Sequence, residues 1–231
     1  MLADTLGVEE YYSTALDQGV GPRPNTVVRN GDGTTTLGWT IATISSTASV
    51  TIEFTARPSL LLHSGDVKVA AASAAATNTN GCVVAPVNAS ASTLIAEVPI
   101  SGRPISHGRW RTDASLRTDE IRARVQATDQ RFDVSPVIGE LSDAEVVTGL
   151  KGDNGQATEL RSRLLATLLN LANRAISSST SVDSVQARRL GIVDVASAVR
   201  YVEATLALDP VANSSRYIDA KQLLDAINGP G

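Results

Sequence analysis

Alternation of apolar and polar residues, the pattern of a half-buried β-strand, marks the first hundred residues. It is most regular over Ser49–Ala56, where every second residue is apolar. Thr34–Ile41 and Asp66–Ala70 are also typical of strands. Asn30–Gly33 and His63–Asp66 precede these runs and indicate turns, since Gly and Asn accept positive φ at low cost. Short strands at this spacing predict a β-sandwich.

The periodicity changes after a segment rich in turn formers, Pro99–Ser106. Before it, residues 71–93 are small and polar and fit a weak strand, a long loop, or both. We therefore predict an α+β protein with segregated domains. Residues 1–99 form the β-sandwich, 100–116 a linker and 117–231 an all-α helical bundle.

Beyond the linker, apolar residues recur every three or four positions, as on one face of an α-helix. The longest such stretch, 157–176, carries a leucine stripe wide enough for a central helix of the bundle. Other helices are predicted to start after residues that can cap an N-terminus. These are Thr118, Ser142, Asp194 and Ser215, and Glu145 completes a capping box with Ser142.

Composition narrows the classes of function. Hydrophobic residues make up 42% of the chain and aromatic residues only 3%, so both cores must be aliphatic. A net charge of −4 gives no electrostatic reason to expect nucleic acid or an anionic membrane as a partner. No apolar run approaches the length of a membrane span, so we expect no membrane insertion.

The single cysteine, Cys82, excludes an internal disulfide framework and a cysteine-clustered metal site. The start Met1–Asp4 lacks the basic and apolar regions of a signal peptide. The chain is therefore expected to be either cytosolic or an internal fragment of a longer exported protein.

Three segments, Leu2–Leu6, Leu37–Ile44 and Ser49–Ile52, together resemble the immunoglobulin-like repeat of many bacterial surface proteins. The resemblance covers residues 2–98. It departs at Gly7, where the repeat usually has Pro, and in lacking a clear N-x-A motif near the end. It implies an immunoglobulin-like sandwich that is exported and displayed outside the cell, as one module of a long chain.

The second half is similar to the C-terminal portion of secreted bacterial proteins without an established activity. The similar segments are Gly108–Thr112, Gln126–Asp133 and Leu164–Ala172. A His-Pro usually follows the first segment in that group, but Asp113-Ala114 stands there in this chain. A ligand role for that histidine is therefore not carried over.

We predict no catalytic, cofactor-binding or metal-ligating residues. The two histidines, His63 and His107, fall in a predicted turn and in the linker, and we expect both to be exposed loop residues. The chain contains no G-x-S-x-G elbow, and abundant serine alone does not indicate a catalytic triad. We therefore predict that the protein is not an enzyme.

Calcium is the one ion left open as a cofactor. Asn30–Gly33 and Gly152–Gly155 are oxygen-rich, but neither continues to the glutamate that closes an EF-hand loop. Turns explain both segments. A second open alternative is an intramolecular isopeptide bond between Lys68 and one of three asparagines, Asn78, Asn80 or Asn88.

Seven arginines lie between Arg103 and Arg131, with acidic residues among them. Internal ion pairs or a solvated face fit this mixture better than a phosphate-binding track. We expect Trp110 and Phe132 to lie in the helical core or between the domains, and the pair Tyr11-Tyr12 to pack at the edge of the sandwich.

The leading hypothesis is a non-catalytic extracellular structural or adhesive module of a bacterial surface protein. The alternatives are a carbohydrate-binding module and an accessory part of a secreted hydrolase. In the resembling repeat a strand precedes the Asp-Thr-Leu segment, but only three residues precede Asp4-Thr5-Leu6. We therefore expect an open sandwich edge that another module or another copy completes by β-strand addition, giving a stalk or filament. Other expected partners are a glycan or a cell-surface protein.

Overall fold

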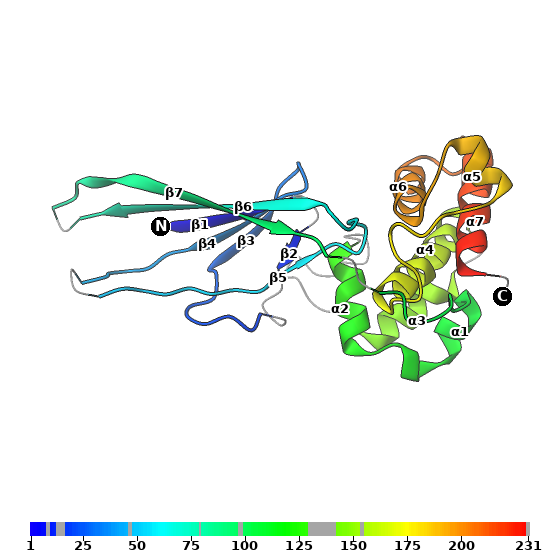
Figure 1. The fold of residues 1–231 in the computed structure, drawn as a ribbon, viewed down its shortest axis with the longest axis horizontal. Helices are drawn as coiled ribbons and strands as arrows, with labels where there is room; N and C mark the ends of the chain where they lie inside the picture. The colour runs from blue at the N-terminus through cyan, green and yellow to red at the C-terminus, as the bar shows by residue number, and fades with distance from the viewer. Residues whose placement is uncertain are drawn as a thin grey trace. The chain divides into compact units, whose positions relative to one another are not determined.

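The computed structural model describes residues 1–7, 10–12, 17–45, 48–78, 80–96, 99–128, 142–152 and 155–229. The chain divides into two compact units, which we describe separately (Figure 1). The β unit comprises Met1–Ser59 and Ser64–Ala96, and the helical unit comprises Leu60–His63 and Glu97–Gly231. The architecture is α+β, with an antiparallel sheet in the N-terminal part and mostly helices in the C-terminal part.

A five-stranded antiparallel sheet with strand order β3-β4-β1-β6-β7 forms most of the β unit. Its strands are β1 (Leu2–Leu6), β3 (Thr26–Arg29), β4 (Thr35–Trp39), β6 (Val67–Thr77) and β7 (Val83–Leu94). β4 confirms the strand expected at Thr34–Ile41, and the expected turn Asn30–Gly33 joins it to β3. β1, which holds the Asp-Thr-Leu segment, lies in the middle of the sheet and pairs with β4 and β6.

A smaller sheet pairs β2 (Glu10–Tyr12) with β5 (Ala56–Pro58). Tyr12 from this sheet packs with side chains of β1 and β4 in a buried aromatic and aliphatic core. The Phe54 ring completes it, with its centroid 5.7 Å from that of Trp39 and 6.1 Å from that of Tyr12. The core also includes Leu6 and Leu37, so it covers the part of the sheet around β1 and β4.

The most regular alternation in the sequence, Ser49–Ala56, forms no strand over its described residues 49–55, so that prediction is wrong there. Its apolar residues Ile52 and Phe54 still pack against the core. The Glu53 N–H donates to the Val20 carbonyl oxygen at 2.7 Å, which places the segment beside residues 17–21. A Cβ on Gly19 would lie 1.8 Å from the Glu53 carbonyl oxygen, so this close approach requires glycine.

Asp17 joins these two segments through a buried carboxylate. One carboxylate oxygen accepts hydrogen bonds from the Gly19 N–H (2.9 Å) and the Thr55 N–H (2.8 Å). The other accepts from the Tyr12 hydroxyl (2.8 Å) and pairs with Arg23. Burial acts to raise the pKa of the Asp17 carboxyl, but these hydrogen bonds outweigh it and hold the pKa below its ordinary value.

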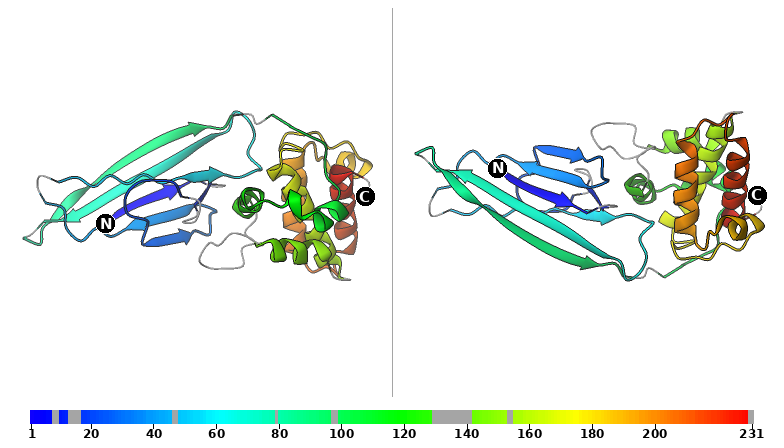
Figure 2. Two further views of the ribbon diagram at one scale, coloured as in Figure 1. Left: turned by 90° about the horizontal axis from the view of Figure 1, so that it is seen from below. Right: turned by 90° about the horizontal axis from the view of Figure 1, so that it is seen from above.

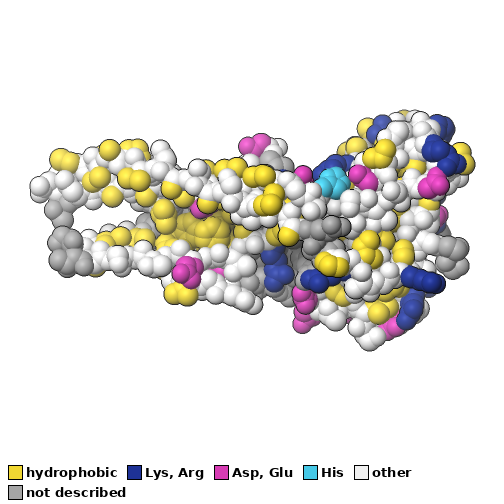
Figure 3. Space-filling view, viewed as in Figure 1, with side chains coloured by type: hydrophobic (Ala, Val, Ile, Leu, Met, Phe, Trp, Pro, Cys, Tyr) yellow, Lys and Arg dark blue, Asp and Glu magenta, His cyan; other side chains and the backbone are white. Residues whose placement is uncertain are grey.

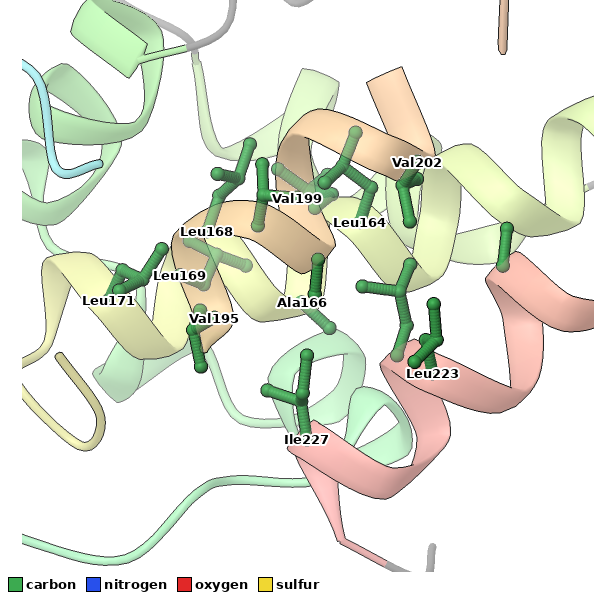
Figure 4. Close-up of a cluster of buried hydrophobic side chains, with 14 of the residues drawn as sticks. Leu164, Ala166, Leu168, Leu169, Leu171, Val195, Val199, Val202, Leu223 and Ile227 are labelled. Atoms are coloured by element: carbon green, nitrogen blue, oxygen red, sulfur yellow. The ribbon is translucent and has the colours of Figure 1, made fainter. Parts of the chain in front are cut away.

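The described helical unit contains seven α-helices and one short 3₁₀ helix. They are α1 (His107–Thr112), η1 (Ala114–Leu116), α2 (Asp119–Thr128), α3 (Asp143–Lys151), α4 (Gln156–Ala172), α5 (Val185–Leu190), α6 (Val195–Leu206) and α7 (Ser214–Asn228). Aliphatic side chains of α4, α6 and α7 converge in its core (Figure 4). The ten labelled there are Leu164, Ala166, Leu168, Leu169, Leu171, Val195, Val199, Val202, Leu223 and Ile227.

Most of the expected helices are confirmed. The Ser142 side chain accepts from the Glu145 N–H, and Glu145 reciprocates at the Ser142 N–H, which makes the predicted capping box at α3. Asp194 caps α6 by accepting from the Ser197 N–H at 2.8 Å. The long helix α4 ends at Ala172, four residues before its expected end, because the chain turns at Arg174, which has a positive φ of 59°.

The predicted linker, residues 100–116, contains the unexpected helix α1, which Ser106 caps. The buried side-chain amide of Asn170 holds α1 in place. The Asn170 side-chain oxygen accepts from the Ile105 N–H (2.8 Å) and the Trp110 indole N–H (3.1 Å). The Asn170 amide N–H donates to the Ile105 carbonyl oxygen and to Asn228 of α7. The linker is therefore packed into the helical unit.

Residues Leu60–His63, which lie between β5 and β6 in the sequence, belong to the helical unit. Leu61 is 3% exposed and joins the helical core. The Leu62 carbonyl oxygen accepts from the buried Ser178 hydroxyl at 2.7 Å. The chain therefore enters the helical unit at residue 60, leaves it at 64 and returns after 96.

In the part of the chain that the structure describes, no helix combines the length and the apolar character needed to span a lipid bilayer.

Leu61→Ala should destabilise the helical unit although the residue precedes every helix in the sequence. Removing a fully packed leucine leaves a cavity, so we expect a loss of about 2–5 kcal/mol in the free energy of unfolding. Chemical denaturation followed by the helical circular dichroism signal measures it. Leu60→Ala, at a half-buried position, is the matched control and should cost less. Equal effects of the two substitutions would show that Leu61 has no special place in the core.

Asp17→Asn should lower the stability of the β unit at neutral pH, by about 1–3 kcal/mol, because buried N–H donors lose a charged acceptor. A carboxyl whose folded pKa lies below its unfolded pKa stabilises the fold above the unfolded pKa, and this contribution is lost as pH falls through the folded pKa.

Denaturation curves of the parent protein and Asp17→Asn between neutral and strongly acidic pH test this sign. The stability difference between them should shrink as pH falls. Asp32→Asn, at an exposed carboxyl whose pKa is lowered by Thr34, is the control and should change stability little. A difference that stays constant down to the lowest pH contradicts the assignment.

Candidate interaction surface

The long hairpin β6–β7 is the most distinctive surface of the β unit, and its two strands lie side by side in every view (Figures 1 and 2). Every residue of β7 is exposed, including Val87 at 69% and Leu94 at 67%. From residue 69 to residue 96 the sequence has no Asp, Glu, Lys, Arg or His. From residue 69 onward the hairpin is therefore an uncharged surface, on which small side chains alternate with exposed valine and leucine side chains.

One face of this hairpin continues the face of the sheet that carries the core. Residues directly opposite one another in a sheet share a face, and Leu2 lies opposite both Trp39 of β4 and Ala74 of β6. Ala74 in turn lies opposite Val87 of β7. We call this face of β6 and β7 the inner face. Its apolar residues are Ala70, Ala72, Ala74, Val87, Ala89 and Ala91.

The inner face is not covered by the small sheet. Ala70 and Ala72 are half-buried, and Ala74 and the β7 residues are exposed. Figure 3 shows hydrophobic side chains in the hollow beside the hairpin. The two-stranded sheet and the Phe54 segment thus cover β1 and β4, while β6 and β7 carry apolar side chains with no second layer among the described residues.

Asp4 of β1 points to the same face, since it lies opposite Leu37 and Ala72. Its Oδ1 atom is buried and has no hydrogen-bond partner among the described residues. Burial, together with the nearby charge of Glu10, raises the pKa of the Asp4 carboxyl above its ordinary value. This carboxyl lies on β1, between the covered strand β4 and the uncovered strand β6.

The hairpin ends in a turn that carries the single cysteine. The Asn78 side-chain oxygen accepts from the Cys82 N–H (2.9 Å), and the Asn78 N–H donates to the Cys82 carbonyl oxygen (2.9 Å). Cys82 is exposed there.

The expectation of two exposed loop histidines is wrong, because both side chains are half-buried in the helical unit. The His63 Nε2 atom lies 3.4 Å from the Asp194 carboxylate at the start of α6. His107 is the first residue of α1, and burial lowers its pKa. His63 is half-buried because the segment Leu60–His63 packs into the helical unit. His107 is half-buried because α1 packs there too. Among the described residues, no three His, Cys, Asp or Glu side chains gather as metal ligands would.

The Asn30–Gly33 segment is a hairpin turn, as the sequence indicates. The Asp32 carboxylate accepts from the Thr34 N–H and hydroxyl, so the turn itself uses this oxygen. Residues 153 and 154 of the other oxygen-rich segment lie outside the described residues.

The register of the hairpin separates the residues proposed for an isopeptide bond. Lys68 lies opposite Thr93, whereas Asn88 lies opposite Ser73, five residues further along β6. An odd number of residues also places Lys68 and Asn88 on opposite faces of the sheet. Asn78 and Asn80 lie beyond the far end of β6, about 30 Å along the strand from Lys68. None of the three asparagines is brought to the lysine.

Two arginines of the cluster, Arg117 and Arg122, form internal ion pairs, which is one of the two arrangements that the sequence predicts. Arg117 is buried, donates to the Trp110 carbonyl oxygen and pairs with Asp143 at 2.7 Å. The Arg117 guanidinium holds the pKa of the Asp143 carboxyl below its ordinary value. Arg122 pairs with Asp119 and lies 3.9 Å from Asp143. These residues lock α2 and α3 to the segment that follows α1.

Trp110 is fully buried in the helical core, which confirms one of its two expected places. Tyr12 is also fully buried and lies in the core of the β unit. Phe132 lies outside the described residues, as does the Tyr11 side chain. Sequence reasoning missed Asp17 and Asn170, because neither lies in a motif, and their partners come from distant segments.

No family model, no curated protein and no solved structure matches this chain.

Proposed function

We propose that the protein is a non-catalytic extracellular structural or adhesive module of a bacterial surface protein, built from an immunoglobulin-like β-sandwich and a helical bundle. In this proposal the sandwich is incomplete within the chain. A strand from another module or another copy is added to it, and repetition of this step gives a stalk or filament.

The uncovered inner face of β6 and β7 carries the proposal. A sandwich needs two layers that bury each other's inner faces, and here five strands oppose a two-stranded sheet. The apolar residues Ala74, Val87 and Ala89 are left exposed on the face that should be internal. An added strand over this face would bury them. Full burial of a valine side chain alone stabilises by about 1.5–3 kcal/mol.

The chemistry of the surface supports apolar packing rather than ionic recognition. The hairpin offers no charged group between residues 69 and 96, so ionic recognition of a substrate is disfavoured there. Its small side chains allow another layer to approach closely. Main-chain hydrogen bonds to an edge of the second layer, the sheet of β2 and β5, would hold the added strand, and its alternate apolar side chains would pack on the inner face.

The test compares two substitutions at adjacent positions of β6. Ala74→Asp places a charge on the inner face, and Ser73→Asp places the same charge on the opposite, outer face. Both residues are exposed, so neither change should affect folding of the single chain. We expect the parent protein and Ser73→Asp to form larger assemblies as concentration rises, and Ala74→Asp to remain smaller.

Light scattering after gel filtration and negative-stain electron microscopy measure assembly, and amide hydrogen exchange locates it. Residues 70–74, which already pair with β1 and β7, should exchange more slowly still in the assembled parent protein. A parent protein that stays monomeric at high concentration, with unchanged exchange over these residues, contradicts the proposal. So does equal assembly of the two variants.

A further inference from the structure

We propose that the free edge of β7 pairs antiparallel with β7 of a second copy, about a two-fold axis at Ala91, so that two five-stranded sheets join into one ten-stranded sheet. This inference concerns the edge of the sheet rather than its inner face. It does not depend on the proposed function.

The backbone of β7 alternates in a direction that the hydrogen bonds define. The Ile95 N–H donates to the Asp66 carbonyl oxygen at 2.8 Å, so Ile95 turns its backbone groups toward β6. Successive residues of a strand point their N–H and C=O groups to opposite sides. The residues two, four, six and eight positions before Ile95 therefore also face β6. Between them Leu94, Ser92, Ser90 and Asn88 face away.

The other side of β6 gives the same phase. Met1 and Ala75 exchange two hydrogen bonds, of 2.5 and 2.7 Å, so Ala75 turns its backbone toward β1. Ser73, two residues earlier, does the same. Ser73 lies opposite Asn88, so Asn88 has no backbone bond to β6.

Over Val87–Leu94 this edge carries no charged side chain, proline or bulge, which are features that protect exposed strand edges, and no described strand covers it. β7 has 12 residues and contains no charged residue. It is the last strand of the sheet, and no other described strand pairs with its free side. Pro86 has no N–H, so it ends the usable part of the edge. The residues beyond it whose backbone groups point away from β6 are Asn88, Ser90, Ser92 and Leu94.

When two copies of β7 pair about Ala91, the free backbone N–H and C=O groups of all four residues form hydrogen bonds. Ser90 then lies opposite Ser92 of the second copy, and Asn88 opposite Leu94. Each such pair exchanges two hydrogen bonds, so the four pairs across the axis give about eight. An axis at Ser90 would instead place Pro86 opposite Leu94, and a carbonyl oxygen of each copy would lose its donor. The axis at Ala91 is therefore the register that uses the whole edge.

The side chains favour a second copy as the occupant. A neutral edge gives no electrostatic selection for a charged partner, and it brings no like-charge repulsion when it meets itself. The central side-chain pairs are small, with serine opposite serine on one face and Ala91 opposite Ala91 on the other, and Leu94 lies opposite Asn88 at each end. A two-fold contact of this kind is isologous and closes as a dimer.

Cysteine cross-linking of the full chain tests the register. In a Cys82→Ser background, Ala91→Cys places the two thiols opposite each other at the axis, where Cβ atoms lie about 4.5–5.5 Å apart. We expect a disulfide-linked dimer in a glutathione buffer. Ala89→Cys, on the same face of the same strand, is the matched control. Its thiols would be offset by four residues, about 13 Å, and should not link.

Ala89→Cys mixed with Thr93→Cys should link as a heterodimer, because these positions lie opposite each other across the axis. Ser90→Lys should weaken dimerisation at least tenfold in sedimentation experiments by charging the edge. Ser73→Lys, on the same face but away from the edge, should not. Linking of Ala89→Cys alone, no linking at Ala91→Cys, or equal effects of the two lysines would overturn the proposal.

The outcomes separate this inference from the proposed function. Assembly that Ala74→Asp abolishes and Ser90→Lys leaves intact supports coverage of the inner face and overturns the β7 edge contact. A dimer linked at residue 91 that forms no larger assembly supports the edge contact and counts against the stalk or filament.

Discussion

The β unit depends on how much of its five-stranded sheet is covered by a second layer. A sheet is stable in water when one face is buried, and here the burying layer is a two-stranded sheet with the segment that carries Phe54. That layer encloses Tyr12 and Trp39. The hairpin β6–β7 extends beyond it, held to the unit chiefly by its pairing with β1. The many alanine and serine side chains of this hairpin let it remain uncovered at modest cost, since each exposes little apolar area.

Much of the architecture could be predicted from local signals. β4, the Asn30–Gly33 turn, the capping box at Ser142 and the cap at Asp194 follow from residues close together in the sequence. These features depend on interactions within one turn or one strand. The leucine stripe of α4 could be recognised for the same reason, because its burial follows from helical periodicity.

Features that depend on distant partners could not be predicted. The alternation over Ser49–Ala56 describes which side chains face the core, but a strand also needs a neighbouring strand, which periodicity does not report. Residues 71–93 have weak strand propensity, yet a long antiparallel register makes them β6 and β7. Helix α1 depends on Asn170, more than fifty residues away. The uncovered surface at Ala74 and Val87 could not be predicted for the same reason. Its exposure depends on which distant segments pack over the sheet.

The inserted segment Leu60–His63 has a consequence for the order in which the protein is made. Leu61 emerges from the ribosome well before α4, the longest helix of the unit, because roughly 100 residues separate them. At ordinary rates of about 5–20 residues per second, the wait is on the order of 5–20 s. During this interval the β unit can already be complete, with Leu61 held at a turn and no core to enter. The helical unit thus finishes folding around a segment that was synthesised well before its long helices.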